Sequence, residues 1–253
     1  MGRQNRAPPM NAFSDSLALA GQLIVHADAV LLRIVALSLQ VSGTACALGA
    51  VLGLALGGWL AVARFRGISL VVGTLNTLLA LPSVVVGLVI YLLLSRSGPL
   101  GFLGWLFSFK AMVLAQAVLV LPVVTALTRQ AVEDAEAAHG EQLRSLGAGT
   151  ALRGLLLAWD ERFALLTVLI ASFGRAISEV GAVMVVGGNI DGFTRVMTTA
   201  IALETSKGDL PLALALGLIL LGVVLALNAL ISVLARWRGV RDSAVARVVG
   251  AGT

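Results

Sequence analysis

Five long apolar runs, separated by short polar segments and one long charged segment, dominate the hydropathy pattern of this chain. The runs cover about residues 34–62, 68–94, 110–128, 163–187 and 211–235. A helix needs about 20 apolar residues to cross the hydrocarbon core of a bilayer. Because a bilayer offers no hydrogen-bond partners, the backbone groups of such a run must be paired within its own helix. The pattern predicts an all-α integral membrane protein with about five spanning helices.

The segment 17–32 leaves the number of spans open. It is apolar but interrupted by His26 and Asp28, which favours an amphipathic helix lying at the membrane interface. If it crosses the bilayer instead, the chain has six spans. The basic N-terminus resembles the start of a signal peptide, but no clean cleavage site follows, so we expect it to be retained. The chain then divides into an N-terminal tail with the interfacial helix (1–33), one membrane domain (34–236) and a cytoplasmic C-terminal tail (237–253).

The distribution of Lys and Arg predicts the orientation. The loop at 63–67, the loop at 129–162 and the tail from 236 carry ten of these residues, and the segments on the other side carry seven. The excess marks the first group as cytoplasmic. The charged loop stays cytoplasmic whether the chain has five spans or six.

Composition supports the membrane assignment. Hydrophobic residues make up 58% of the chain and charged residues 12%, about half the charged share of about 25% in a soluble domain. The net charge is +5, yet the basic residues are scattered singly at span ends. This arrangement favours anchoring in membrane lipid and excludes a nucleic-acid partner.

Three glycines in the first run lie on one stripe of the predicted helix. Gly49, Gly53 and Gly57 are spaced four residues apart, and the absent side chains let another helix approach closely. Two interpretations stay open, a contact between subunits and packing within one chain.

Two prolines lie inside predicted spans. Pro82 and Pro122 each remove an intrahelical hydrogen bond and favour a kink. Such kinks either line a transport pathway or are passive. After the fourth run, residues 193–207 are predicted to form a short amphipathic helix, too polar to span.

The fourth run holds the clearest intramembrane charges. Arg175 and Glu179 are four residues apart, so on a continuous helix they share a face and can pair. Ionisable groups at membrane depth usually face a cavity or the bundle interior. We interpret them as part of a pathway or gate, and a structural ion pair between helices is the alternative. The Gly187-Gly188-Asn189 sequence that follows indicates a turn or span end.

Catalytic and metal-binding motifs are missing from the sequence. There is no GxxxxGK[ST] loop for ATP and no HExxH or nucleophile–base pair. Cys46, His26 and His139 are isolated from one another in the sequence, which gives no metal-ligand pattern. We therefore expect a chain that is not an enzyme and holds no cofactor of its own.

Ten acidic and basic residues gather in the loop between the third and fourth runs. They are Arg129, Glu133, Asp134, Glu136, Glu141, Arg144, Arg153, Asp160, Glu161 and Arg162. Within the loop, the glycines near Gly147 separate two segments with apolar positions. A short helix–turn–helix of this kind suits insertion into a groove of a soluble partner.

The loop resembles the docking segment of the permease subunits of type I ABC importers. The family signature is Glu-Ala-Ala, three residues, Gly, nine residues, then Ile-x-Leu-Pro. Here Glu141 takes the Glu position, Gly147 the Gly position and Leu157 the Ile position. Gln142-Leu143 replaces Ala-Ala and Trp159-Asp160 replaces Leu-Pro. A literal Glu136-Ala137-Ala138 occurs five residues earlier, with glycines at the wrong spacing.

Two other stretches, LALPSVVVGLVIYLLLSRSGPLG and the sequence from Gly174 to Gly217, resemble the oxyanion importers, most closely the tungstate-type permeases. The resemblance implies the type I transmembrane fold with a cytoplasmic coupling helix, in the bacterial cytoplasmic (inner) membrane. It also implies a homodimer, two ATPase subunits holding ATP and Mg²⁺, and an external anion-binding protein. Molybdate, sulfate or another anion is an alternative cargo, and an ATP-independent secondary transporter is a second alternative.

We predict two sets of functional residues. The predicted coupling residues are Glu141, Leu143, Leu146, Gly147, Ala148, Leu152 and Leu157. The predicted pathway or gate residues are Arg175, Ser178, Glu179, Gly187, Gly188 and Asn189.

Overall fold

The computed structural model describes residues 9–26 and 28–250, and this part of the chain is almost entirely helical. The helices are α1 (Pro9–Val25), α2 (Ala29–Val62), α3 (Ile68–Leu79), α4 (Ser83–Leu94), the 3₁₀ helix η1 (Gly101–Leu103), α5 (Phe109–Ser145), α6 (Thr150–Asp160), α7 (Arg162–Ile177), α8 (Gly181–Gly187), α9 (Met197–Lys207) and α10 (Leu210–Gly250). The predicted C-terminal tail continues α10 to Gly250. Residues 1–8 and 251–253 of the predicted tails lie outside the described residues.

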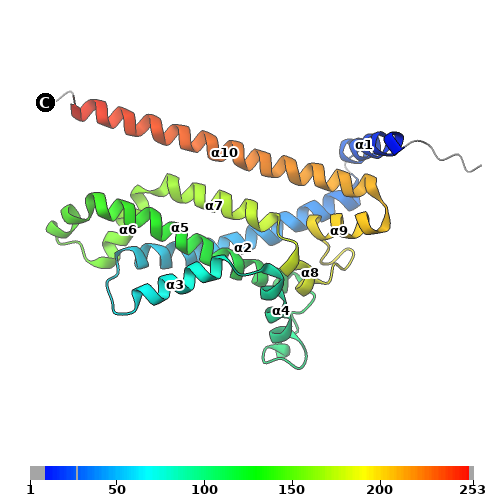
Figure 1. Cartoon of the computed structure of the whole chain (residues 1–253), viewed down its shortest axis with the longest axis horizontal. Helices are drawn as coiled ribbons and strands as arrows, with labels where there is room; N and C mark the ends of the chain where they lie inside the picture. The colour runs from blue at the N-terminus through cyan, green and yellow to red at the C-terminus, as the bar shows by residue number, and fades with distance from the viewer. Residues whose placement is uncertain (1–8, 27, 251–253) are drawn as a thin grey trace, which may run out of the picture.

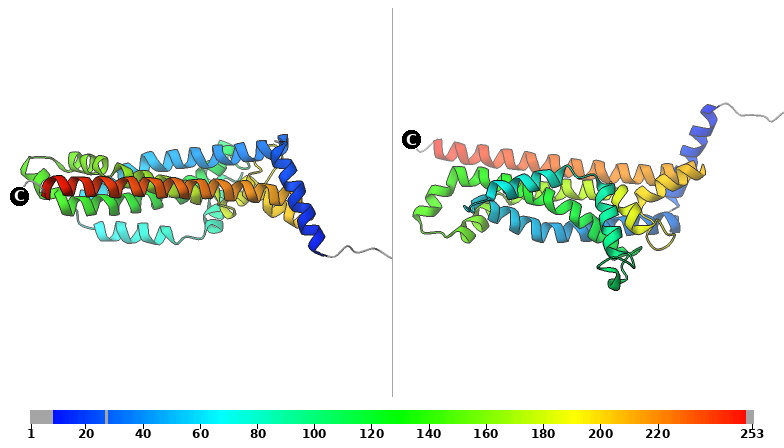
Figure 2. Two further views of the ribbon diagram at one scale, coloured as in Figure 1. Left: turned by 90° about the horizontal axis from the view of Figure 1, so that it is seen from above. Right: turned by 60° about the horizontal axis from the view of Figure 1, so that its bottom comes forward.

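The long helices α2, α5, α7 and α10 run side by side along the longest axis of the molecule (Figure 1). The turn between α5 and α6 lies at one end of this bundle, and α8, α9 and the start of α2 lie toward the other. Helix α1 lies across that second end, as the two views in Figure 2 show. The positive-inside count predicts that the α5–α6 end is the cytoplasmic one.

Three unbroken helices are long and apolar enough to cross a membrane, and two bent helix pairs bring the number of candidate spans to five. The unbroken helices are α2, α5 and the Leu210–Ala235 part of α10. Helix α1 contains only a shorter apolar segment, Ser16–Val25. The part of the chain that the structure describes thus contains three to five candidate spans, and five if each bent pair is one span.

Two of the predicted spans are not continuous helices. The run at 68–94 bends by 101° between α3 and α4, where Pro82 precedes the first residue of α4. The run at 163–187 bends by 56° between α7 and α8. Pro122, in contrast, stays inside α5. Of the two predicted kinks, the one at Pro82 is therefore a full break in the helix.

The helix that contains the third predicted span is longer than the span. The span is predicted to end at residue 128, but α5 continues through the charged segment to Ser145. Ala, Glu, Gln and Arg dominate residues 129–145, and all are strong helix formers. Arg129 and Glu133 also form an ion pair one turn apart. Charge in this segment ends the membrane span without ending the helix.

The predicted interfacial helix at 17–32 has the wrong bounds. Helix α1 ends at Val25, and the first turn of α2 begins at Ala29. Asp28 caps α2, because its Oδ1 accepts hydrogen bonds from the backbone N–H of Val30 (2.9 Å) and Leu31 (3.1 Å). Asp28, which interrupts the apolar pattern of the sequence, is thus the N-cap residue of α2.

The glycine stripe of α2 packs against α5 within the same chain. A Cβ atom on Gly49 would lie 2.7 Å from Val120 Cγ1, and one on Gly53 2.8 Å from Val124. On Gly57 it would lie 2.6 Å from the backbone oxygen of Thr125. Of the two interpretations of this stripe, the structure supports packing within one chain.

Candidate functional site

The first candidate region is the turn that joins α5 to α6. Gly147 has φ +79°, a left-handed conformation that favours glycine, directly after the last turn of α5. The backbone N–H of Gly147 donates to Arg144 O at 2.9 Å, and that of Ala148 donates to Leu143 O at 3.0 Å. The predicted turn at Gly147 is confirmed, and it reverses the chain so that α6 can return toward the bundle.

The predicted coupling residues divide into two groups. Leu157 is buried with Val62 and Val132, and Leu143 packs against this cluster. Leu146 is 81% exposed and Leu152 50%. The remaining members, Glu141, Gly147 and Ala148, are exposed or half-buried. The inward leucines hold α6 in place, which leaves the tip of the turn open to a partner.

Two glycines set the position of α6 on α2. A Cβ atom on Gly154 of α6 would lie 2.9 Å from the backbone oxygen of Gly58 in α2. The same Cβ atom on Gly154 would lie 3.3 Å from Val62 Cγ2. Because no larger side chain fits, α6 lies directly across the C-terminal end of α2.

A buried carboxylate connects the end of α5 to α6. The side chain of Glu136 is 8% exposed, and its Oε1 lies 2.6 Å from Arg144 Nη2 and 3.5 Å from Arg153 Nη2. Gly140 makes room for it, since a Cβ atom there would lie 2.6 Å from Glu136 Cδ. The part of α5 from Arg129 to Ser145, together with α6, forms what we call the arm, and we call Glu136, Arg144 and Arg153 the arm clamp. Sequence reasoning missed it, although the literal Glu136-Ala137-Ala138 with Gly140 was the available signal.

The second candidate region is the break between α7 and α8, at Ser178–Val180. Neighbouring helices satisfy the backbone groups that the break releases. Gln116 Nε2 of α5 donates to Ala176 O at 2.9 Å, and Thr198 Oγ1 of α9 donates to Glu179 O at 2.8 Å. Glu179 Oε1 accepts from the backbone N–H of Ala182 at 3.2 Å, at the start of α8. Irregular backbone at membrane depth is tolerated where protein surrounds it in this way.

The predicted alignment of Arg175 and Glu179 on one helix face is wrong. Helix α7 ends at Ile177, so the two residues are not on a continuous turn. Among the described residues no ion pair joins them, and Arg175 is exposed while Glu179 is half-buried. This removes the structural ion pair between them as an explanation. Their role in a pathway or gate stays a prediction.

The two breaks adjoin each other. A Cβ atom on Gly181, the first residue of α8, would lie 2.6 Å from Val84 Cγ2 and 2.9 Å from Ser83 Oγ at the start of α4. One turn further, a Cβ atom on Gly87 would lie 2.7 Å from Ala182 Cα. Helices α4 and α8 are thus packed together from the points where both spans bend. A movement of one break must therefore be accommodated by the other.

Gly187, Gly188 and Asn189 form the turn at the other end of α8. Gly188 has φ +69° and Asn189 φ +51°, a conformation that Gly and Asn adopt most readily. Asn189 Nδ2 donates to Thr199 O at 3.2 Å, and Thr194 Oγ1 donates to Gly187 O at 2.6 Å. The predicted turn is confirmed, and a full α8 length separates it from Ser178 and Glu179.

A second buried carboxylate lies beyond this turn, near the end opposite to the arm. The side chain of Glu204 is 6% exposed, with Lys207 Nζ at 3.0 Å and Arg195 Nη1 at 3.7 Å. Arg195 also lies 3.3 Å from Asp191. These ion pairs tie the α8–α9 connection to α9. The sequence predicts a short helix over residues 193–207 and no contact for it; the observed helix α9 covers Met197–Lys207.

Comparison with known proteins gives full-length relatives. No family model matches the chain. It is 41% identical to the tungstate uptake system permease protein TupB of Peptoclostridium acidaminophilum, over 88% of this chain and 97% of that protein. It is 44% identical to a probable anion ABC transporter permease protein of Haloferax volcanii, over 79% and 88%. The molybdenum transport system permease protein ModB of Escherichia coli K12 is 31% identical, over 69% and 81%.

Proposed function

The chain belongs to the permease family of ABC-type anion transporters, and from this premise we propose that it forms the membrane pathway of an ATP-driven tungstate importer. The observation that carries the proposal is the 41% identity to a tungstate permease over nearly the whole length of both chains. Two molybdenum transport permeases are more distant, at 31% and 28% identity. Tungstate is therefore the preferred cargo and molybdate the second candidate.

In this proposal two copies of the chain enclose the pathway, and each binds one ATPase subunit through its α5–α6 arm. ATP and Mg²⁺ bind to the ATPase subunits, and an external binding protein delivers the anion. ATP binding closes the ATPase dimer, moves the arms and opens the paired permeases outward. Hydrolysis then restores the inward-facing state. Family membership favours this scheme over an ATP-independent secondary transporter.

Helix α5 supports a coupling route from the arm to the pathway. Glu136 of the arm clamp and Gln116 of the α7–α8 break both belong to this one unbroken helix. A displacement of α6 acts on α5 through the clamp, and α5 contacts the break through the Ala176 carbonyl. The adjoining breaks of α3–α4 and α7–α8 supply the segments that rearrange. Arg175, Ser178 and Glu179 lie at that point and remain the proposed gate residues.

The proposal is tested by reconstituting the permease with its ATPase and binding protein in liposomes. ATP-dependent accumulation of tungstate is the expected result, with molybdate and sulfate taken up less well at equal concentration. Preferential uptake of molybdate or sulfate would overturn the assignment of the cargo. Uptake that continues without ATP would overturn the coupled mechanism.

A further inference from the structure

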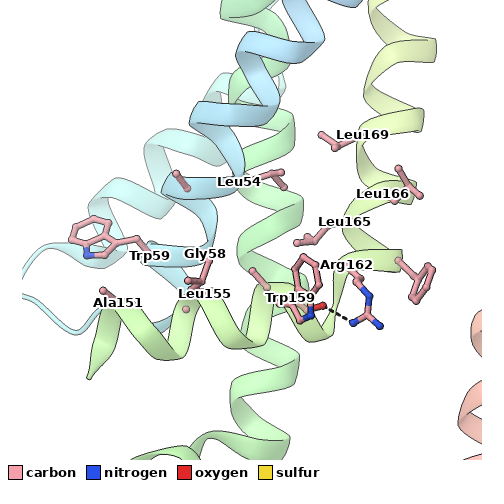
Figure 3. Close-up of a pocket in the computed structure, with 14 residues that line it drawn as sticks. Leu54, Gly58, Trp59, Ala151, Leu155, Trp159, Arg162, Leu165, Leu166 and Leu169 are labelled. Carbon is pink, nitrogen blue, oxygen red and sulfur yellow. Dashed lines mark hydrogen bonds between the residues drawn. The ribbon is translucent and has the colours of Figure 1, made fainter. Parts of the chain in front are cut away.

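A groove of about 750 Å³ lies between α2, α6 and α7 at the cytoplasmic end of the bundle. Figure 3 shows α6 crossing the bottom of this groove, with α2 on one side and α7 on the other. Helices α2 and α7 belong to membrane spans, whereas α6 belongs to the arm. The groove therefore begins at the level of the interface and runs between two spans into the bilayer.

The walls of the groove are apolar except at one point. Of its 14 lining residues, Arg162 is the one with a charged side chain. Asp160 and Glu161 precede Arg162 in the sequence, but neither lines the groove. A ligand that matches this surface has a long apolar body and a single anionic group.

Aromatic side chains mark the level of the lipid headgroups. Trp59 and Trp159 both line the groove near its α6 end, and they are 48% and 70% exposed. Trp is enriched at this depth, where its ring meets lipid and its N–H meets water. The groove then continues along α7 from Arg162 to Leu169, about 10 Å at the helical rise of 1.5 Å per residue.

Arg162 is held in place at the same level. Its Nη1 donates to Trp159 O at 2.9 Å, and its guanidinium lies 5.4 Å from the Trp159 ring and 5.0 Å from the Phe163 ring. These contacts fix the cation beside the groove and leave other guanidinium N–H groups for a ligand.

We propose that this groove binds one membrane phospholipid with an anionic headgroup. Arg162 receives the headgroup phosphate, and an acyl chain lies on Leu155, Leu166 and Leu169. Anionic lipids are concentrated in the cytoplasmic leaflet, on the side to which the positive-inside count assigns this end. Because α6 forms the bottom of the groove, the bound lipid fills the space between the arm and α7. The lipid then stabilises the position in which α6 packs against α2.

The test measures phospholipid binding to the purified permease in detergent by native mass spectrometry. The probes are dioleoyl phosphatidylglycerol and dioleoyl phosphatidylcholine, which share acyl chains and differ in net charge. For the wild-type protein we expect tighter binding of phosphatidylglycerol. Arg162→Gln should weaken that binding about fivefold, since one basic residue near a membrane surface contributes about 1 kcal/mol. Arg66→Gln, at an exposed arginine outside the groove, is the matched control and should leave it unchanged.

A second variant keeps the charge and fills the groove. Ala55 is an exposed lining residue of α2, so Ala55→Trp should reduce binding of both lipids without unfolding the protein, as checked by circular dichroism. Equal binding of the two lipids to the wild type, or unchanged binding in both groove variants, would overturn the proposal. So would release of the lipid when the ATPase subunit binds, because the groove would then be a protein interface. Persistence of the lipid in that complex is the expected result.

Discussion

The backbone oxygen of Gly58 in α2 faces Gly154 in α6 so closely that a Cβ atom on Gly154 would lie 2.9 Å from it. This contact joins a membrane span directly to the helix that we propose docks on the ATPase. The two glycines are 96 positions apart in the sequence. Movement of α6 cannot be absorbed by a flexible side chain at this point.

Replacement of Gly154 by Val should displace α6 from α2. Overpacking of this kind costs about 1–3 kcal/mol of stability, and the displaced arm should lose ATPase co-purification and tungstate uptake. Gly149→Ser is the matched control, because Gly149 has open space around its Cβ position and Ser is favoured at a helix N-cap. Normal assembly in the Gly154→Val variant would contradict the role of this contact.

A bulky residue at Gly147 should disrupt the turn between α5 and α6. The φ of +79° costs an L-residue about 1–2 kcal/mol, so Gly147→Leu should reduce both ATPase co-purification and anion uptake. Gly147→Asn should retain most of each, since Asn enters the left-handed region more easily. Unchanged assembly and uptake in Gly147→Leu would remove the residue from the coupling segment.

Neutralising Glu136 should weaken the arm clamp. Glu136→Gln leaves the largely buried Arg153 without its carboxylate, and hydrogen bonds to charged groups contribute about 1.5–3 kcal/mol. The melting temperature and the coupling of ATP hydrolysis to uptake should both fall. Glu133→Gln removes a more exposed ion pair with Arg129, worth about 0–1 kcal/mol. Equal effects of the two variants would argue against a special role for the clamp.

Glu179→Gln separates charge from helix capping at the α7–α8 break. The amide oxygen of Gln can still accept the hydrogen bond from the Ala182 N–H, so thermal stability should change little. Uptake should fall if the carboxylate belongs to the gate, and transport in liposomes measures this. Wild-type transport in this variant would leave Glu179 with the capping role alone.

The α2–α5 contact offers a test of packing within the chain. Gly57→Ala places a methyl group 2.6 Å from the Thr125 oxygen, and the expected loss of stability is about 1–3 kcal/mol. Gly43→Ala in the same helix meets nothing within 4 Å and should be neutral or slightly stabilising. Thermal unfolding in detergent measures both. If Gly57→Ala changed only the oligomeric state, the stripe would be a subunit contact after all.

The hydropathy pattern predicted where the spans lie because apolar length is a local property. It could not separate Pro82, which begins a new helix after a 101° bend, from Pro122, which stays inside α5. The difference depends on neighbours, since the α4 start packs on Gly181 and the middle of α5 packs on the α2 glycines. These partners are more than 60 residues away in the sequence.

The candidate site shows the same division. Gly147 could be predicted, because a turn between two apolar segments needs a left-handed residue. The arm clamp could not, because Glu136 and Arg153 come together only when α6 folds back on α5. Arg175 and Glu179 were paired on the assumption of a continuous helix, and the end of α7 at Ile177 separates them.

The unbroken course of α5 sets a spacing rule for the arm. Its 37 residues span about 55 Å, well beyond a hydrocarbon core of about 30 Å. The number of residues between the span and Ser145 therefore sets two quantities. One is the distance of α6 from the membrane, and the other is the angular position of α6 around the axis of α5. An inserted residue in 129–140 would turn α6 by about 100° around the helix axis. A change of seven residues, about two full turns, would return it to nearly the same face, about 10 Å higher or lower.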